Sequence, residues 1–332
     1  MINYSNRIKN FNKEKNKVYN NLAIVGGGRW AQIYLKEITE NFKNIEKIYF
    51  YTNYPDKINN FIKKKKIKKV VIKNIKEVKK IKSEYVIIAN KNENHIRFAK
   101  LLISLRCNIL VEKVFFLSLK NFQNLLTNLK KKRVLLHLSS QYYYANYFYY
   151  IKQKLIKNEV INKIEINWSD ALNEKRSGQL KTHDLKVNFL EDIFYHLNSI
   201  FYIFLGNGII DINEDIKKFT EFSLAKFSYN DSTIKIKFTR SSKKRKRQLT
   251  IFFNKNNKIN INFANDEKII VKYNNKKIQI PSFVCQKTLK FQILSFLRSS
   301  FSNSEISLNN LSNLKNLFSS LNKLRKHTNK IK

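Results

Sequence analysis

The chain has 332 residues, and its 65 Lys and Arg against 24 Asp and Glu give a formal net charge of +41. A hydrophobic content of 43%, with 25 Phe and 17 Tyr, excludes a disordered basic tail, because such a chain can offset its ordering entropy by burial. At roughly 100–200 residues per domain, the length predicts two domains, each with its own core.

The composition also indicates the cellular compartment in which the protein is expected. Two cysteines, Cys107 and Cys285, are too few for a disulfide framework, so a reducing environment is expected. No run reaches the roughly 18 apolar residues that span a bilayer. The Lys- and Asn-rich start lacks the apolar centre of a secretory signal. We therefore expect a cytoplasmic protein without a membrane segment.

The first half of the chain alternates short apolar runs with amphipathic segments. A strand at 22–25 is expected to end in glycines and to lead into a helix that starts near Arg29. Further strands are expected at Lys47–Thr52, Val70–Ile72, Tyr85–Ala89 and Asn108–Val111, with helices at Ile58–Lys66 and Asn94–Leu105. This alternation predicts βαβ units and therefore a doubly wound parallel sheet of the Rossmann type.

The segment Gly26–Ala31 (GGGRWA) fits the pattern G-x-G-x-x-A between that first strand and its helix. Gly26 permits a tight turn, Gly28 lets the backbone approach a pyrophosphate, and Ala31 takes the small position where helix meets strand. Half of the 6 glycines of the chain fall here. We predict a dinucleotide-binding loop; the alternative is an ordinary strand–helix turn.

The end of the second strand bears on which dinucleotide is bound. An NAD site usually has an acid there, roughly 20 residues after the glycines. This chain instead has Tyr51, Thr52 and Asn53, with Lys57 nearby. Neutral hydroxyl and amide groups beside a lysine would tolerate a 2′-phosphate. We expect NADP, with NAD as the alternative.

The second half has closely spaced runs of alternating polarity. Strands are expected at Ile161–Trp168, Phe222–Tyr229, Thr233–Thr239, Gln248–Phe253, Lys258–Phe263 and Ile269–Tyr273, with helices near Glu191–Leu205 and in the tail from Cys285 to His327. Such strands predict a large, mainly antiparallel open sheet. The expected organisation is a basic extension (1–20), an NAD(P)-binding domain (21–138) and an α/β domain for substrate and oligomerisation with C-terminal helices (139–332).

Two basic runs, Lys63–Lys69 and Lys243–Arg247, are candidates for phosphate-binding patches. Lysine is spread along the whole chain, so we attribute most of the charge to composition and expect both runs to be solvated. Arg240–Arg247 is expected in a hairpin connection, which favours the same interpretation. Nucleic-acid binding, suggested by charge alone, is therefore not favoured.

Four stretches, in order, resemble the Gfo/Idh/MocA oxidoreductases, a family that includes glucose–fructose oxidoreductase and inositol dehydrogenases. Residues 23–31 (AIVGGGRWA) resemble the family's nucleotide loop, and residues 86–95 (VIIANKNENH) its A-T-P-N-x-x-H segment. Residues 109–118 (ILVEKVFFLS) resemble its V-E-K-P segment, and Asp192–His196 its D-x-x-x-H helix. The resemblance covers most of the chain beyond residue 21, including the helical tail.

The resemblance implies hydride transfer between a nicotinamide and a hydroxyl or carbonyl carbon of a sugar, sugar nucleotide or polyol. It implies that Lys113, Asp192 and His196 are catalytic, with His196 as the proton acceptor in the oxidising direction. It also implies a homodimer or homotetramer. The cofactor-binding residues would be Gly26, Gly28, Arg29, Trp30, Ala31, Thr52, Asn53, Ala89, Asn90, His95 and Glu112.

The chemistry of these residue types agrees with such roles. Asp192 and His196 stand at i and i+4, so on a helix they project from one face, where a carboxylate can orient an imidazole and raise its basicity. Lys113 follows a buried strand, at the carboxyl edge where open α/β sheets bind ligands. Without the family, an Asp-x-x-x-His pair is common by chance and one lysine carries little weight.

Several residues leave alternatives open. Val114 stands where the family has Pro after the lysine, and Lys91 replaces the earlier strand-end Pro; Val114 removes a fixed φ beside Lys113. This substitution favours the alternative function, a non-catalytic NAD(P)-binding sensor or partner protein. His95 is expected to be structural or to line the cofactor site, whereas Tyr143 and His183 are candidate substrate contacts. The scattered histidines and cysteines lack metal-ligand spacing, so no metal is expected.

Overall fold

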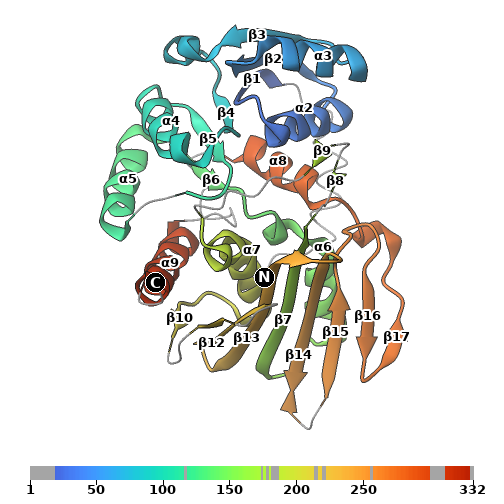
Figure 1. The fold of residues 1–332 in the computed structure, drawn as a ribbon. Coiled ribbons are helices and arrows are strands. Elements are labelled where there is room, and N and C mark those ends of the chain that lie inside the picture. The colour runs from blue at the N-terminus through green and yellow to red at the C-terminus, as the bar shows by residue number, and fades with distance from the viewer. Residues whose placement is uncertain are drawn as a thin grey trace. The chain divides into compact units, whose positions relative to one another are not determined.

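The computed structural model describes residues 19–115, 118–172, 175–176, 179–180, 187–212, 216–218, 222–254, 257–299 and 311–329. The chain forms two compact units. The first comprises Met1–Ser140 and Leu289–Leu314, and the second Gln141–Thr288 and Lys315–Lys332 (Figure 1). Each has its own sheet, which confirms the predicted α/β class. No helix of the described segments is long and apolar enough to cross a membrane.

The first unit contains a six-stranded sheet in the order β3-β2-β1-β4-β5-β6, in which every pairing is parallel. The strands are β1 (Tyr19–Val25), β2 (Ile45–Thr52), β3 (Val70–Asn74), β4 (Tyr85–Ile88), β5 (Asn108–Val111) and β6 (Leu136–Leu138). The order reverses between β1 and β4, which is where doubly wound sheets bind ligands. The predicted Rossmann sheet is confirmed.

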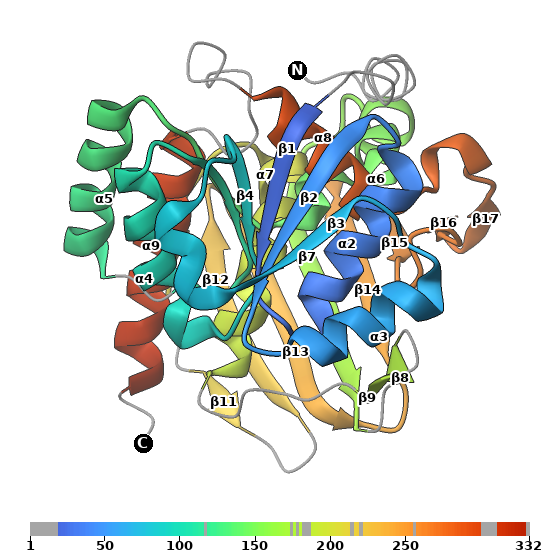
Figure 2. The ribbon, with the colours of Figure 1, turned by 90° about the horizontal axis from the view of Figure 1, so that it is seen from above.

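Helices cover both faces of this sheet. They are α2 (Arg29–Asn41), α3 (Pro55–Lys65), the 3₁₀ turn η1 (Ile75–Lys80), α4 (Asn92–Ser104) and α5 (Leu119–Lys132), joined late in the sequence by α8 (Thr288–Arg298). Right-handed crossovers place α2 and α3 on one face and α4 and α5 on the other (Figure 2). The ring of Phe296 on α8 meets Tyr85 and His137 edge-on, each at 5.5 Å between ring centroids.

Continuous apolar runs explain why these strands form, because a parallel strand is buried on both faces. Leu22 to Val25 and Ile109 to Val111 are all fully buried. Helix α3 begins at Pro55, three residues before the expected start, since the fixed φ of proline suits the first helical position. Its last turn holds the exposed Lys63, Lys64 and Lys65, whose charges complement the C-terminal helix dipole.

The second unit contains a nine-stranded sheet in the order β10-β12-β13-β7-β14-β15-β16-β17, with β11 added beside β12. The strands are β7 (Ile161–Ala171), β10 (Ile210–Asp211), β11 (Lys217–Lys218), β12 (Ser223–Tyr229), β13 (Ser232–Ser242), β14 (Lys246–Phe253), β15 (Lys258–Asn262), β16 (Ile270–Tyr273) and β17 (Lys276–Ile278); β8 (Lys175–Arg176) and β9 (Gln179–Leu180) pair separately. All pairings in the large sheet are antiparallel except β13 with β7. The predicted mainly antiparallel sheet is confirmed.

The connection around Lys243–Arg247 differs from expectation. Strands β13 and β14 do not form a hairpin, because β7 lies between them and pairs with both. Residues 243–245 therefore cross the end of β7, and Arg247 falls inside β14 with only 3% of its surface exposed. The expectation that the whole run is solvated is wrong for Arg247, since strand alternation turns it to the same face as the buried Leu249 and Ile251.

One face of this sheet packs against α7 (Phe189–Leu205), which the structure extends two residues before the expected start. Asn188 caps the helix, its side-chain oxygen accepting from the Leu190 backbone N–H at 2.9 Å. Phe194 and Phe201 of α7 contact Phe227 of β12. The remaining elements of the unit are η2 (Gln141–Tyr144), α6 (Asn146–Tyr150), the π-helical turn η3 (Ile151–Leu155), η5 (Ser282–Val284) and α9 (Leu311–Asn329). The first residues of α9, up to Leu314, are counted with the first unit.

Candidate cofactor and active-site residues

The glycine loop lies between β1 and α2, and each glycine has a different environment. Gly26 has φ +150°, and a Cβ there would stand 2.3 Å from the Ala89 carbonyl oxygen. At Gly27 a Cβ would stand 2.5 Å from the Thr52 hydroxyl oxygen. At Gly28, the exposed residue that precedes α2, a Cβ would meet nothing within 4 Å. The close approaches hold the loop against the ends of β2 and β4, and the open space lies at the helix start.

The start of α2 presents backbone donors to that open space. Helix α2 has no side-chain N-cap and no acidic residue in its first turn, which contains Arg29, Trp30 and Ala31. Ala31 is fully buried, as the small position where helix meets strand requires. A phosphate beside Gly28 would therefore meet unshielded N–H groups and the positive end of the helix dipole.

Asn90 adds a polar group next to the glycines. It follows β4, and its backbone nitrogen lies 3.1 Å from the Cβ that Gly26 lacks. Both polar atoms of its side-chain amide are buried without a hydrogen-bond partner. Buried amides are normally satisfied, so this one fits a polar group of a bound molecule. Together with the space at Gly28, it shows that the loop residues fit a dinucleotide.

His95, at the start of α4, connects two loops of the first unit. Its ring is fully buried, with Nδ1 3.0 Å from the Val114 carbonyl oxygen and Nε2 3.1 Å from the Asn90 carbonyl oxygen. Burial lowers the pKa of this histidine below its ordinary value, and its contacts with the two carbonyls offset only part of that effect. A neutral imidazole carries a single N–H, so it donates to one carbonyl at a time. His95 thus joins the segment after β4 to the segment after β5.

Glu112 directly follows β5 and belongs to a buried network with Tyr34 of α2. The hydroxyl of Tyr34 donates to Glu112 Oε1 at 2.5 Å and lies 3.2 Å from Ser139 Oγ. Burial raises the pKa of Glu112, and the hydrogen bonds from Tyr34 and Ser139 lower it in part. The next residue is Lys113, and the peptide bond between Lys113 and Val114 is cis. Val114 itself is buried.

The end of β2 carries the residues expected beside the cofactor ribose. Thr52 is buried, and its hydroxyl oxygen accepts the Tyr54 backbone N–H at 3.0 Å. Asn53 and Lys57 are exposed, while Asp56 is the one acid in the first turn of α3. The last four residues of β2 (YFYT) include no Asp or Glu, so the strand itself supplies no carboxylate at its carboxyl end.

In the second unit, α7 holds Asp192 and His196 one turn apart. The Asp192 carboxylate lies 3.8 Å from the guanidinium of Arg240 on β13, and both side chains are mostly buried. The Arg240 guanidinium also lies 4.8 Å from the centre of the Phe189 ring. Asp192 is therefore fixed from the sheet as well as from its own helix.

His196 contacts an aromatic cluster on the inner face of the sheet. Its ring stacks on Trp168 of β7, with 5.8 Å between centroids and 15° between planes, and meets Tyr142 edge-on at 5.4 Å. The Arg247 guanidinium lies 3.9 Å from the centre of the Trp168 ring and forms a buried ion pair with Asp170. The Trp168 ring is thus held by a buried cation while it supports the imidazole.

The other site residues expected from the sequence do not all lie beside His196. Tyr143 is buried, and its hydroxyl accepts from the Asn198 side-chain amide at 2.9 Å. His183 lies outside the described residues. Lys113 belongs to the first unit, whereas Asp192 and His196 belong to the second. Within the described parts of the chain, no group of His, Cys, Asp and Glu is arranged to hold a metal.

Sequence reasoning missed the partners that fix these side chains. Tyr34, on the helix expected after the glycines, binds Glu112, 78 residues away. Trp168 is one of the 2 tryptophans in the chain, which was an available signal. Arg247 lay hidden in a run of basic residues, and no local pattern distinguished it from its exposed neighbours.

The parallel sheet and the glycine loop at its switch point define a dinucleotide-binding protein of the Rossmann class. Residues 20–140 match the GFO_IDH_MocA model, described as an oxidoreductase family with an NAD-binding Rossmann fold. Residues 20–140 therefore form a Rossmann domain of the Gfo/Idh/MocA kind, which confirms the resemblance for this part of the chain. No curated protein matches the chain.

Solved structures share the fold of both units at low sequence identity. UDP-N-acetylglucosamine 3-dehydrogenase GnnA from Acidithiobacillus ferrooxidans has a TM-score of 0.71 at 11% identity, covering 93% of this chain and 98% of its own. A Gfo/Idh/MocA family oxidoreductase from Vibrio cholerae has 0.67 at 13%, covering 94% and 99%. Biliverdin reductase from Synechocystis sp. PCC 6803, in complex with biliverdin and NADP+, has 0.64 at 15%, covering 92% and 98%. At these identities the likeness establishes the fold.

Proposed function

We propose that this protein is an NAD(P)-dependent oxidoreductase acting on a hydroxyl or carbonyl carbon of a sugar, sugar nucleotide or polyol. The observation that carries the proposal is the glycine loop, where close backbone approaches at Gly26 and open space at Gly28 fit a dinucleotide. The substrate class rests on the family and on relatives such as the UDP-N-acetylglucosamine 3-dehydrogenase. Biliverdin reductase on the same fold shows why the substrate needs its own test.

The proposed chemistry divides between three side chains. When bound, the nicotinamide supplies the hydride acceptor in the oxidising direction. A nitrogen of the His196 imidazole then accepts the proton of the substrate hydroxyl, so that a carbonyl forms as hydride leaves the same carbon. The Lys113 ammonium donates a hydrogen bond to the substrate oxygen, and Asp192, fixed by Arg240, orients His196.

The first test measures cofactor binding and then turnover. Quenching of protein fluorescence during NADPH and NADH titration gives cofactor affinity, and a panel of sugars, sugar nucleotides and polyols is assayed by absorbance of the reduced nicotinamide. We expect His196→Asn and Lys113→Ala to lower turnover at least about 100-fold with cofactor affinity kept. His327→Asn, on α9, and Lys91→Ala, exposed before α4, are the matched controls.

Two results would redirect the proposal. Unchanged turnover in both active-site variants would remove the assigned trio. Tight cofactor binding with no turnover on any member of the panel would favour a non-catalytic NAD(P)-binding sensor or partner protein instead.

We propose NADP as the preferred cofactor. The support is the end of β2, where buried Thr52 and exposed Asn53 stand in place of an acid, with exposed Lys57 close in sequence. A carboxylate there would bind the ribose 2′-hydroxyl of NAD and repel a 2′-phosphate. The ratio of kcat/KM for NADPH and NADH decides; a strong NADH preference would overturn the proposal. Lys57→Ala should lower the ratio.

The family also leads us to propose a homodimer or homotetramer. Light scattering behind size exclusion, over a range of protein concentrations, measures the mass directly. A chain that stays monomeric at every concentration used in the activity assay would overturn this proposal and leave the catalytic one intact.

A further inference from the structure

Lys113 is the proposed substrate contact of the first unit, and the residues on either side of it are buried. Glu112 has 4% of its surface exposed and Val114 has 1%, whereas Lys113 itself is half-buried. A long, flexible side chain that reaches out of a buried segment is placed only as well as its own backbone is placed. The contacts that fix this segment therefore decide where the ammonium of Lys113 lies.

The carboxylate of Glu112 accepts hydrogen bonds from three groups. They are the hydroxyl of Tyr34, 2.5 Å from Oε1, the hydroxyl of Ser139 and the backbone N–H of Lys113 itself. The third bond ties the carboxylate directly to the peptide group of the lysine. Several donors hold a buried carboxylate in one position, because the loss of any of them leaves a charged group less well satisfied. Glu112 is therefore an anchor for the backbone of Lys113.

Tyr34 connects this anchor to the helix that follows the glycine loop. It lies in the second turn of α2, fully buried, and its ring centroid is 6.3 Å from that of Trp30 in the first turn. Burial and the neighbouring Glu112 carboxylate raise the pKa of Tyr34 well above its ordinary value of 10.0, so the hydroxyl keeps its proton and remains a donor. One hydrogen bond thus joins α2 to the segment that carries Lys113.

The residue on the other side of Lys113 makes this anchor more important. Unlike a proline at the same position, Val114 does not fix its own φ through a ring. Its carbonyl oxygen lies 3.0 Å from Nδ1 of the buried His95. The backbone on both sides of the lysine is thus held by hydrogen bonds to distant residues, and a change in one of those residues can loosen it.

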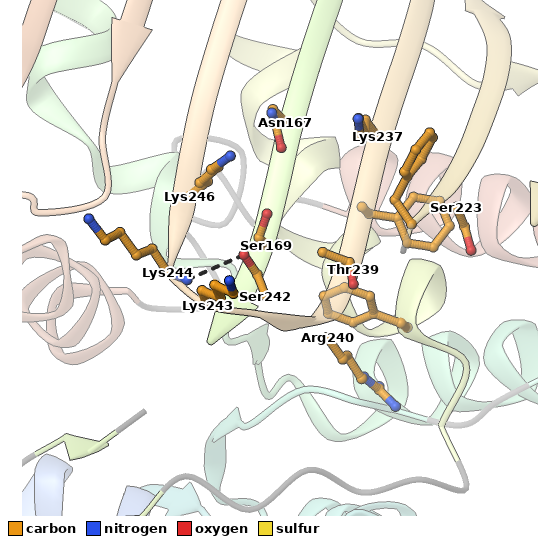
Figure 3. A pocket seen from close by; sticks show the side chains of 13 residues that line it. Asn167, Ser169, Ser223, Lys237, Thr239, Arg240, Ser242, Lys243, Lys244 and Lys246 are labelled. Carbon is orange, nitrogen blue, oxygen red and sulfur yellow. Dashed lines mark hydrogen bonds between the residues drawn. The ribbon is translucent and has the colours of Figure 1, made fainter. Parts of the chain in front are cut away.

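The second unit fixes its proposed catalytic carboxylate in the converse way. The Arg240 guanidinium lies 3.8 Å from the Asp192 carboxylate, and Arg240 extends from β13 away from the lysines of the connection to β14 (Figure 3). There a cation fixes a carboxylate. In the first unit the residue to be placed is the cation, and the fixed group beside it is the Glu112 carboxylate. Each unit therefore contains the partner that its own proposed catalytic residue needs.

We propose that Tyr34 is a positioning residue for Lys113 and acts through its hydrogen bond to Glu112. The proposal rests on the proposed function, in which the Lys113 ammonium donates a hydrogen bond to the substrate oxygen. Tyr34 is fully buried, so its effect on that ammonium is indirect. Without the hydroxyl, Glu112 loses one of its donors and the backbone of Lys113 is less well fixed. The ammonium then spends less time where the transition state needs it.

The test pairs Tyr34→Phe with Tyr147→Phe as a matched control. Tyr147, on α6, is also fully buried, and its hydroxyl donates to Asp266 Oδ1 at 3.0 Å. Each variant thus loses one oxygen atom and one hydrogen bond between a tyrosine and a carboxylate. Hydrogen–deuterium exchange measures how often residues 112–115 open. We expect exchange there to be about 10-fold faster in Tyr34→Phe, because a hydrogen bond to a charged group is lost, and unchanged in Tyr147→Phe.

Turnover shows whether the anchor matters for catalysis. We expect Tyr34→Phe to lower kcat about 10-fold and to keep the Kd for NADPH within about twofold, because the glycine loop is untouched. In a Lys113→Ala background the same change should lower kcat by less than about twofold, since no ammonium is left to place. Tyr147→Phe should lower kcat by less than about twofold in both backgrounds.

Unchanged exchange in Tyr34→Phe would overturn the proposal, and so would faster exchange with full turnover. A loss of kcat that persists in the Lys113→Ala background would also overturn it, because the effect would then not pass through the lysine. If the unaltered protein turns over no member of the substrate panel, the proposed function fails, whereas the exchange result still supports or overturns the anchoring of Lys113 by Tyr34. Urea unfolding checks that all variants are folded under the assay conditions.

Discussion

The two candidate sites of this protein are built by different means. In the first unit the glycine loop depends on where the backbone lies, and single missing Cβ atoms at Gly26 and Gly27 allow strand ends to approach. In the second unit the surroundings of His196 depend on side chains packed in layers, from Asp170 through Arg247 and Trp168. At Gly26 and Gly27 an added Cβ would collide with a neighbouring strand end, whereas the second site depends on a buried charge.

Adding one carbon to the loop tests the first half of this contrast. Gly26→Ala should destabilise the protein by about 4 kcal/mol, because it combines an unfavourable φ with a collision against the Ala89 carbonyl. Gly28→Ala should leave unfolding unchanged and weaken NADPH binding, since its Cβ enters the open space. Urea unfolding and fluorescence titration measure the two effects. Equal stability losses would contradict the environments assigned to the glycines.

Removing the buried cation tests the second half. Arg247→Met should cost about 3–4 kcal/mol, because it removes the cation that pairs with the buried Asp170 carboxylate. Lys246→Met, one residue earlier but exposed, should change stability by less than about 0.5 kcal/mol. If Arg247→Met and Lys246→Met unfold at the same urea concentration, the ion pair does not stabilise the second unit.

Acid should weaken the first unit through His137. Burial lowers the pKa of His137 to about 4, below its ordinary value of 6.5, so folding holds this ring neutral. The unfolded chain then binds a proton more readily, and stability falls as pH drops from about 6.5 to about 4, by roughly 3 kcal/mol in total. His137→Phe should remove that part of the pH dependence. An unaltered slope in the variant would mean that other groups cause the acid sensitivity.

The smallest expected effect concerns His95. His95→Ala should cost about 2 kcal/mol by removing the buried contacts to Asn90 and Val114, and it should weaken NADPH binding by loosening the segment after β4. His95→Gln retains a donor and should recover part of the affinity. If His95→Gln recovers stability and neither variant changes NADPH affinity, His95 stabilises the fold and does not set the loop geometry.

Local pattern predicted five of the strands of the first unit and its helices α2, α3 and α4, but not β6, α5 or the return of α8 to this unit. Asn108–Val111 was expected and found without change, because Ile109, Leu110 and Val111 form the apolar run that a parallel strand buried on both faces needs. The placement of β7 between β13 and β14 could not be predicted, since alternation gives the faces of a strand but not its neighbours. The burial of Arg247 follows from that placement. Contacts such as Tyr34 with Glu112 also join distant residues, and the roles of Lys113, Asp192 and His196 remain predictions.

The insertion of β7 has a consequence for how the chain is made. Both neighbours of β7 in the sheet come from residues 232–253, after α7 and the strands β8 to β12. A growing chain therefore exposes its central strand, rich in isoleucine and with both edges unpaired, before either neighbour has been synthesised. Such edges invite pairing with other chains, and closing so long a loop is slow. Synthesis that stops near residue 230 should yield a product that aggregates more than one that stops after β17, because only the longer product can pair both edges of β7.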